Sequence, residues 1–202
     1  MKLEVHPLTR ERWRDLVELF SRPGASIARG CWCMYYRKTG PSGIGPGEAN
    51  RRALKSLVDR GTVPGLIGYR DGSPVGWISL GPRDGYARLR HSPVMKPVDD
   101  KPVWSIICFF VDAKARGQGV SECLLKAGIE YARSQGATLL EAYPVDKAER
   151  SQADFMWFGA KRMYDRAGFK EVARRKATRP VVRKAIRGRK AGGSRRGAPG
   201  GR

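Results

Sequence analysis

Residues 109–121 read FFVDAKARGQGVS, and this segment joins a hydrophobic run to an amphipathic one. The run before it, residues 103–111, is apolar almost throughout, which is typical of a strand buried on both faces of a sheet. Residues 121–133 place apolar side chains on one face and charged ones on the other, which predicts a helix. The segment therefore predicts a strand, a short basic loop and a helix in succession.

The loop is suited to holding an anion. Gly117 and Gly119 leave the backbone uncrowded, so that successive N–H groups can point at one ligand. The start of the next helix adds unpaired N–H groups and the positive end of its dipole, and Arg116 adds a charged donor. An ordinary strand-to-helix turn is equally compatible with the loop taken alone. The loop lacks the Gly-Lys-Ser/Thr of a P-loop and the full glycine set of a dinucleotide fingerprint.

The loop resembles the acetyl-CoA loop of the GNAT acetyltransferase superfamily. In that pattern an Arg or Gln is followed, after two residues, by Gly and then, after one more, by Gly or Ala. Arg116, Gly119 and Ser121 stand at these positions, and Ser121 departs from the usual residue types. Residues 163–172 are similar to the end of the family's last long helix, where a Tyr precedes a Gly-Phe pair and a strand. The resemblance covers residues 3–182.

The resemblance implies an α/β (α+β) GNAT fold. Its mixed central sheet would have about six or seven strands, splayed in the middle and flanked by helices. The pattern along the chain agrees, with strands expected at residues 3–8, 66–70, 75–80, 103–111, 139–143 and 169–173. Helices are expected at residues 12–20, 48–59, 121–133 and 154–167. Residues 176–182 are expected to complete a hairpin or to cover an edge of the sheet.

Length and charge indicate one domain with a tail. The chain has 202 residues, of which 1–182 are expected to form a GNAT N-acetyltransferase domain. Twelve of the 40 basic residues lie from Arg174 onward, where neither Asp nor Glu occurs. Residues 183–202 are therefore expected to be a disordered, basic Gly/Arg-rich tail. Such a tail could make weak contacts with nucleic acid or an anionic surface, or be a solvated extension without a function.

Other features bound the cellular setting. No apolar run approaches the roughly 20 residues of a membrane span, and the first residues lack the layout of a signal peptide. The chain's cysteines show no disulfide framework, so a cytoplasmic location is expected. They are Cys31, Cys33, Cys108 and Cys123. The resemblance also leaves a homodimer open.

The resemblance implies a set of cofactor-binding residues. The CoA diphosphate would meet the loop, and the pantetheine arm would pair with the end of the strand before it. The residues are Phe109, Phe110, Val111, Arg116, Gly117, Gln118, Gly119, Val120 and Ser121. Acetyl-CoA would be the acyl-donor substrate, attacked directly in a ternary complex by a primary amine of a small molecule or peptide.

The resemblance also implies catalytic residues. Tyr164 matches the family's tyrosine before the Gly-Phe pair, which would protonate the leaving thiolate. The alternative for Tyr164 is a core aromatic residue with a hydrogen-bonded hydroxyl. For the general base, Glu141, Tyr143 and Asp146 lie where the cleft is expected to open, and none of them stands out. Some relatives rely mainly on proximity of the two substrates.

Residues 30–37, GCWCMYYR, are dense in large and soft side chains. They could belong to the core, line the acceptor pocket, or supply half of a metal site. The metal interpretation is poor, because the only histidines, His6 and His91, are not suitably spaced, and no metal is expected. The family places acceptor-binding elements early in the chain, so Trp32 and Tyr35 are expected near the substrate.

Two further points stay open at this level. Residues 81–96 are either a solvated loop with one helical turn or a basic rim that attracts an acidic acceptor or the CoA phosphates. The chain could also be an acyl-CoA-binding or nucleic-acid-associated protein without turnover, because Ser121 departs from the pattern and the base is unclear. The positive balance of the chain argues against polycationic acceptors.

Overall fold

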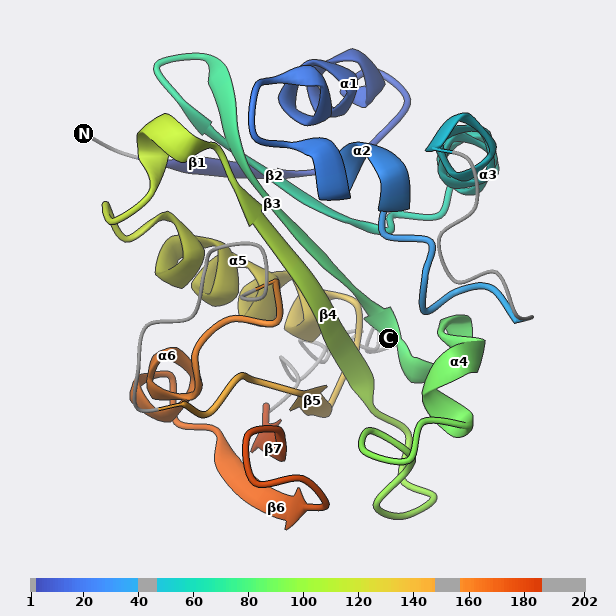
Figure 1. The fold of residues 1–202 in the computed structure, drawn as a ribbon, viewed down its shortest axis with the longest axis vertical. Coiled ribbons are helices and arrows are strands. Elements are labelled where there is room, and N and C mark those ends of the chain that lie inside the picture. The colour runs from blue at the N-terminus through green and yellow to red at the C-terminus, as the bar shows by residue number, and fades with distance from the viewer. Residues whose placement is uncertain (1–2, 40–46, 148–156, 187–202) are drawn as a thin grey trace, which may run out of the picture.

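The computed structural model describes residues 3–39, 47–147 and 157–186, and its centre is one seven-stranded mixed sheet (Figure 1). The strands lie in the order β1-β2-β3-β4-β5-β7-β6. Neighbouring strands run antiparallel except for β4 and β5, which are parallel. Their bounds are β1 (Glu4–Pro7), β2 (Gly65–Arg70), β3 (Ser73–Pro82), β4 (Trp104–Val111), β5 (Leu139–Ala142), β6 (Lys170–Arg174) and β7 (Pro180–Ala185). The mixed α/β architecture predicted from the sequence is confirmed.

The sheet opens between β4 and β5. These strands pair only from Trp104 opposite Leu140 to Ile106 opposite Ala142, whereas β4 continues to Val111. Beyond Ile106, the edge of β4 that faces away from β3 is therefore not covered by β5. This is the splayed middle that the fold class implies.

Helices cover both faces of the sheet. On one face, α1 (Trp13–Ser21), α2 (Ser26–Cys31) and α3 (Gly47–Asp59) enclose a core that includes Phe20 and Trp77. On the other face, α5 (Val120–Ser134) packs its apolar side against β3 and passes behind β4 in Figure 1. The short α6 (Lys161–Arg166) joins the core on the α5 side.

Gly76 explains why α5 begins close to the end of β4. It pairs with Val111 across the β3–β4 ladder. A Cβ at Gly76 would lie 2.8 Å from Val120 Cγ1 and 2.9 Å from Leu124 Cδ1. The missing side chain therefore lets the first turn of α5 lie directly on β3, which sets the loop after β4 at the open part of the sheet.

The helix predicted over residues 154–167 is shorter in the structure. Only α6 is helical, residues 157–160 are not, and residues 154–156 lie outside the described ranges. The carbonyl of Trp157 accepts the N–H of Phe109 at 2.5 Å, and Ala160 forms a parallel bridge with Val145. Residues 157–160 thus lie in the opening between β4 and the chain that follows β5.

The sequence left alternatives open for two other segments. Residues 81–96 continue from the end of β3 into η1 (Arg83–Gly85) and α4 (Ala87–Arg90), which is the one helical turn expected. Tyr86 is fully buried, whereas Arg90 and His91 are exposed. β7 completes a hairpin with β6, the first alternative for residues 176–182, and lies between β5 and β6. It also includes residues 183–185, which were expected in the tail. The remaining tail, residues 187–202, lies outside the described ranges.

Candidate functional site

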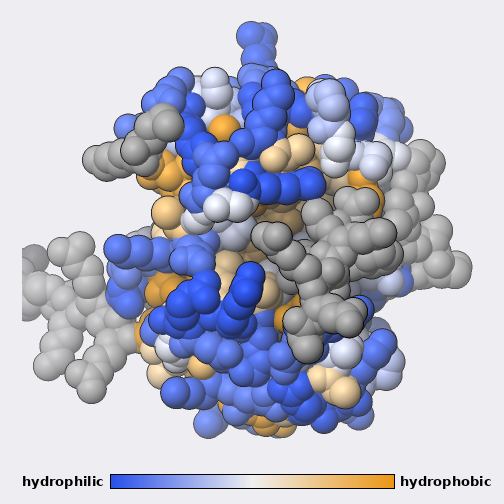
Figure 2. Space-filling view, turned by 60° about the vertical axis from the view of Figure 1, so that its left-hand side comes forward, coloured by the Kyte–Doolittle hydropathy of each residue, from blue (hydrophilic) through white to orange (hydrophobic). Residues whose placement is uncertain are grey.

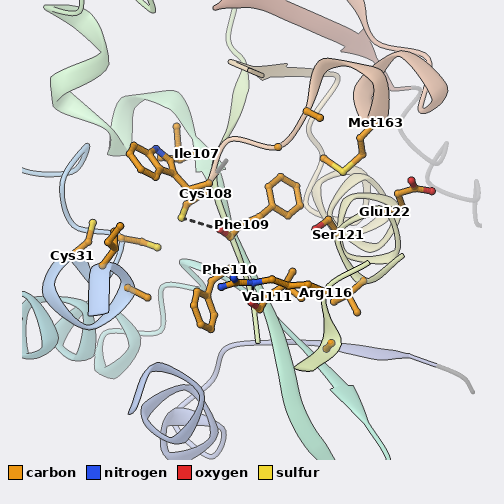
Figure 3. Close-up of a pocket in the computed structure, with 18 of the residues that line it drawn as sticks. Cys31, Ile107, Cys108, Phe109, Phe110, Val111, Arg116, Ser121, Glu122 and Met163 are labelled. Carbon is orange, nitrogen blue, oxygen red and sulfur yellow. Dashed lines mark hydrogen bonds between the residues drawn. The ribbon is translucent and has the colours of Figure 1, made fainter. Parts of the chain in front are cut away.

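A cavity of about 750 Å³ lies beside the open part of β4. Figure 2 shows the corresponding face as two hydrophilic regions separated by a hollow in which more apolar residues are visible. In Figure 3, Cys31 and Cys108 lie on one side of the cavity and Ser121 and Met163 on the other. The cavity is therefore bounded by α2 on one side, by α5 and α6 on the other, and by β4 between them.

The loop between β4 and α5 forms one end of the cavity. Gly117 and Gly119 have φ of 74° and 76°, a left-handed conformation that favours glycine, and a Cβ on either would meet nothing within 4 Å. Residues 116–119 are exposed. Gly119 is the N-cap of α5 and offers no side-chain oxygen to the first N–H groups of the helix. The exposed backbone of the loop and the positive end of α5 therefore lie at the same end of the cavity.

Three arginines line the same end of the cavity: Arg116, Arg162 and Arg166. The Nε of Arg116 donates to the Val111 carbonyl at 3.1 Å, which folds its side chain back along the end of β4. Arg166, on α6, forms an ion pair with Glu122 on α5. Sequence reasoning did not single out Arg162 and Arg166, although two arginines four apart before a Gly-Phe pair mark one face of a helix.

The predicted cofactor residues meet at the cavity with one exception. Phe109, Phe110, Val111, Arg116, Gly117, Gly119, Val120 and Ser121 all line it, and Gln118 does not. The Gln118 side chain instead donates to the Lys114 carbonyl at 2.9 Å and accepts from Arg70. At the edge of β4, the Phe109 N–H and the Val111 carbonyl are bonded within the chain, to the Trp157 carbonyl and to Arg116.

The opposite end of the cavity is aromatic, aliphatic and thiol-bearing. Tyr35 lines it as predicted, together with Phe20, Ile27, Ala28, Cys31, Cys33 and Tyr36. Trp32 does not line it, so the prediction that Trp32 lies near the substrate is not met by this structure. Its ring is buried, stacks on Trp13 at 5.7 Å between centroids, and meets Phe20 edge-on at 5.1 Å. Trp32 is a core residue whose large apolar surface is better buried than presented to a ligand.

Tyr164, the predicted proton donor, is not among the residues that line the cavity. Its side chain is 0% exposed, and its hydroxyl donates to the Phe158 carbonyl at 2.9 Å. Burial raises the pKa of Tyr164 well above its ordinary value. The ring lies behind Gly159, where an added Cβ would come within 3.3 Å of it. The structure therefore shows the alternative that the sequence left open, a core aromatic residue with a bonded hydroxyl.

Glu141 and Tyr143, the predicted candidates for the base, also lie away from the cavity. Glu141 is 0% exposed and forms ion pairs with Arg83 and, at 2.8 Å, with Arg183. The Tyr143 hydroxyl donates to Glu141 at 2.6 Å, and burial and the Glu141 charge raise the pKa of Tyr143. The two residues are two apart, so they share one face of the chain, and that face meets η1 and β7 rather than the cavity. They form a buried polar cluster.

The cavity wall has more positively than negatively charged side chains. Within the described ranges, three arginines and one carboxylate, Glu122, line the cavity, and that carboxylate is paired with Arg166. No group of three or more His, Cys, Asp or Glu side chains in these ranges is arranged to hold a metal ion. The cavity thus has a positive end with open backbone amides and an apolar end without a carboxylate.

Comparisons with known proteins identify the family and support the fold. The model of the acetyltransferase (GNAT) family matches residues 32–169. PH1933 from Pyrococcus horikoshii OT3 has a similar structure, with 16% identity, a TM-score of 0.53, and coverage of 92% of this chain and 99% of that chain. A ribosomal-protein-alanine N-acetyltransferase from Brucella melitensis is 19% identical, with a TM-score of 0.52 and coverage of 91% and 99%. A search of curated protein sequences finds no match.

A third similar structure is an N-acetyltransferase from Staphylococcus aureus Mu50, 16% identical, with a TM-score of 0.52 and coverage of 92% and 99%. At these identities the structural neighbours support the fold. Among the described residues, no helix combines the length and the apolar character needed to cross a membrane.

Proposed function

The chain belongs to the acetyltransferase (GNAT) family, and on that premise we propose that it acetylates the primary amine of a small, largely apolar acceptor. As a member of this family it is an acyl-CoA N-acyltransferase, and acetyl-CoA is its acyl donor. The acceptor class and the route of transfer are the parts that we propose.

The loop end of the cavity fits the phosphates of CoA. Gly117 and Gly119 leave their backbone amides open, and the start of α5 supplies further N–H groups. Arg116, Arg162 and Arg166 add charged donors, which form the stronger hydrogen bonds to phosphate. We therefore assign the diphosphate to residues 116–121 and the pantetheine arm to the end of β4 at Phe109–Val111. There the arm would replace the bonds of the Phe109 N–H to the Trp157 carbonyl and of Arg116 to the Val111 carbonyl.

The proposal for the acceptor rests on the side chains at the apolar end of the cavity. Its wall consists of aromatic, aliphatic and thiol side chains, and the lining carboxylate, Glu122, belongs to the phosphate end. A polycationic acceptor would bring charges that find no opposite charge there and would meet the arginines across the cavity. An amine with one apolar body would instead bury it against Tyr35, Tyr36 and Phe20.

The chain contributes mainly positioning to the proposed reaction. Bound acetyl-CoA supplies an activated acetyl group, and the acceptor amine must reach it with its lone pair free. None of the side chains predicted as bases lines the cavity, so we propose direct attack in a ternary complex. The C–N bond forms, the thioester C–S bond breaks, the amine loses its proton to water, and the departing CoA thiolate takes a proton from water. Holding two substrates in reacting geometry can by itself contribute several kcal/mol.

The test combines binding with turnover. Calorimetry with acetyl-CoA measures donor binding, and release of the CoA thiol measures turnover with 2-phenylethylamine, hexylamine, spermidine, kanamycin and a short peptide. We expect kcat/KM for 2-phenylethylamine to exceed that for spermidine at least about tenfold, which corresponds to ~1.4 kcal/mol. A preference for spermidine or kanamycin would contradict the acceptor class. Absence of binding at millimolar acetyl-CoA would contradict the assignment of the cavity.

One observation favours a second candidate, an acyl-CoA-binding protein without turnover. Tyr164, Glu141 and Tyr143 all lie away from the cavity lining. The same experiment separates the two functions, because such a protein would bind acetyl-CoA without releasing thiol in the presence of any amine.

A cytoplasmic location, a homodimer and a contact of the tail with nucleic acid stay predictions. The tail is tested by deleting residues 187–202, which spares β7. Salt-dependent binding to DNA that disappears with the deletion would support a role for the tail, and unchanged binding would contradict it.

A further inference from the structure

Three cysteines from two distant parts of the chain line the same cavity. Cys31 and Cys33 belong to the end of α2 and the turn after it, and Cys108 lies in β4 directly before Phe109. All three are free thiols. In Figure 3, the side chains of Cys31 and Cys108 lie on the same side of the cavity. The proposed acetyl transfer uses these thiols only as part of the cavity wall and assigns them no chemical role.

Cys33 belongs to a buried core cluster beside the cavity, and Cys108 packs against the same cluster. The interaction between the two thiols is the largest influence on both groups, and it lowers the pKa of Cys33 and raises the pKa of Cys108. The Cys33 sulfur accepts the Trp77 Nε1–H at 3.2 Å, and the Cys108 thiol donates to the Phe109 carbonyl at 3.6 Å. The bond from Trp77 stabilises a thiolate at Cys33, beside a second thiol whose pKa is raised.

The turn that carries Cys33 is held in an unfavourable conformation. Trp32 and Cys33 have φ of 46° and 51°, the left-handed region that residues other than glycine rarely adopt. Each such residue costs roughly 1–3 kcal/mol and persists only where its surroundings enforce it. Here Trp32 is held between Trp13 and Phe20, and its N–H donates to the Ala28 carbonyl at 2.7 Å. The packing of Trp32 thereby holds Cys33 beside Trp77 of β3.

We propose that Cys33 and Cys108 form a reversible disulfide when the protein meets a peroxide, and that this bond ties the acceptor wall of the cavity to β4. Both side chains pack in the same cluster, and a disulfide forms when the two sulfurs approach to about 2.05 Å. The disulfide would fix the segment between α2 and Tyr35 to Cys108, the residue that precedes Phe109. The consequence for turnover rests on the proposed acetyl transfer, whereas the formation of the bond does not.

The chemistry balances with one molecule of hydrogen peroxide. The Cys33 thiolate attacks one oxygen, the O–O bond breaks, and the products are a sulfenic acid and a hydroxide that takes up a proton to become water. The Cys108 sulfur then attacks the Cys33 sulfur, the S–O bond breaks, and the departing hydroxide takes the Cys108 proton. Two thiol sulfurs are oxidised, and both peroxide oxygens are reduced to water.

Mass spectrometry tests the bond without any assay of activity. The full chain is treated with excess hydrogen peroxide, alkylated and digested with trypsin. Peptide 30–37 contains Cys31 and Cys33, and peptide 91–114 contains Cys108, because Lys96 and Lys101 precede prolines and resist cleavage. We expect the two peptides to be cross-linked, with a loss of two hydrogens, and to separate again with dithiothreitol.

Matched variants identify the partners. Cys31→Ser, which changes the neighbouring thiol in the same cavity, and Cys123→Ser, which changes the exposed thiol on α5, should keep the cross-link. Cys33→Ser and Cys108→Ser should abolish it, while calorimetry with acetyl-CoA verifies that they are folded. A disulfide within peptide 30–37, or alkylation of both Cys33 and Cys108 after oxidation, would overturn the proposal.

The effect on turnover is read separately. We expect oxidation to lower acetyl transfer at least about tenfold in the wild-type chain and in Cys31→Ser, and dithiothreitol to restore it. Oxidised protein that carries the cross-link but transfers acetyl at the original rate would overturn the inferred control of the acceptor wall. If no amine is acetylated even by the reduced protein, the proposed function fails while the cross-link remains measurable.

Discussion

The two ends of the cavity are built in different ways. At the phosphate end, the ligand would meet backbone amides of a glycine loop and the start of α5, with arginines around them. At the acceptor end, it would meet side chains alone, from α1, α2 and the turn after α2. Backbone recognition serves one constant substrate, whereas a wall of side chains can be changed residue by residue. A motif therefore identifies the first end, and no comparable motif identifies the second.

A similar contrast separates the cavity from the polar cluster of Glu141, Tyr143, Arg83 and Arg183. Both sites lie along the divide between the two halves of the sheet. The cavity occupies the part where β4 has left β5, while the cluster lies where the strands are still paired, at Glu141 opposite Ser105. The cluster stabilises the junction, and the opening beyond it provides the space for ligands.

The largest expected effect concerns Glu141→Gln. Removing one partner of a buried ion pair leaves the others unpaired, so the free energy of unfolding should fall by about 3–5 kcal/mol. Denaturant unfolding measures this, with Glu130→Gln on the exposed face of α5 as the control, for which less than ~1 kcal/mol is expected.

Acetyl transfer by the folded fraction of Glu141→Gln should equal that of the wild-type chain, because Glu141 does not line the cavity. A large loss of turnover with intact binding of acetyl-CoA would instead restore Glu141 as the base.

The next effect tests the glycine loop through Gly119→Val. A β-branched residue does not tolerate a φ of 76°, so the amides of the loop should turn away from the ligand. We expect the affinity for acetyl-CoA to fall about 100-fold, or roughly 2.7 kcal/mol, in a calorimetric titration.

Gly61→Val is the matched control, because Gly61 has a φ of 81° and open space around its Cβ position but lies after α3, outside the cavity lining. Both variants should lose a similar ~1–2 kcal/mol of stability. Equal losses of acetyl-CoA affinity would show that the loop has no special role.

A pH-dependent effect is expected from Asp112, which supports the loop from below. Its carboxylate accepts the Lys114 N–H and the Arg22 guanidinium, each at 2.8 Å. Burial alone would raise the pKa of Asp112, but the hydrogen bonds from Arg22 and the Lys114 amide outweigh it and lower the pKa below 3.8. The carboxylate therefore adds stability above its ordinary pKa, and this is lost as the pH falls through the lowered value.

The comparison with Asp112→Asn isolates this contribution. Wild-type chain should be more stable than the variant by about 1.5–3 kcal/mol at pH 6, and the difference should shrink between pH 4 and pH 2. Urea unfolding over this range measures it. A difference that stays constant with pH would contradict the lowered pKa.

The smallest effect is expected for Tyr164→Phe, which removes the hydrogen bond to the Phe158 carbonyl. The loss of stability should be about 1 kcal/mol, and the turnover number should stay within about threefold of the wild-type value. Tyr131→Phe on α5 serves as the control for removing a tyrosine hydroxyl outside the cavity. A loss of turnover beyond about 100-fold, with affinity for acetyl-CoA unchanged, would restore Tyr164 as the proton donor.

The strands, the main helices and the glycine loop at one end of the cavity could be predicted from the sequence because they depend on local patterns. An apolar run, two glycines and an amphipathic repeat fall within residues 103–133, and the backbone conformations that they favour are the ones observed. Ser121, which stands where the family pattern has Gly or Ala, also lines the cavity.

Only the tertiary structure determined which of the side chains predicted to lie in the cleft line the cavity. Glu141 and Tyr143 follow from the end of β5, but only the pairing with β7 and the position of Arg83 determine which way they face. Trp32 and Tyr35 differ by three positions, and the aromatic partners of Trp32 draw one into the core and leave the other at the cavity. The interaction between Cys33 and Cys108 joins segments that no local pattern relates.

The amino-acid sequence by itself thus determined the family, the sheet-and-helix order and the loop that would hold the phosphates, because glycine conformation and apolar periodicity act over a few neighbouring residues. Only the folded chain decided which polar groups are buried with partners and which side chains meet the cavity. Those outcomes depend on strand register and on packing between distant segments, where burial of an unpaired charge or hydroxyl is too costly to occur without a partner.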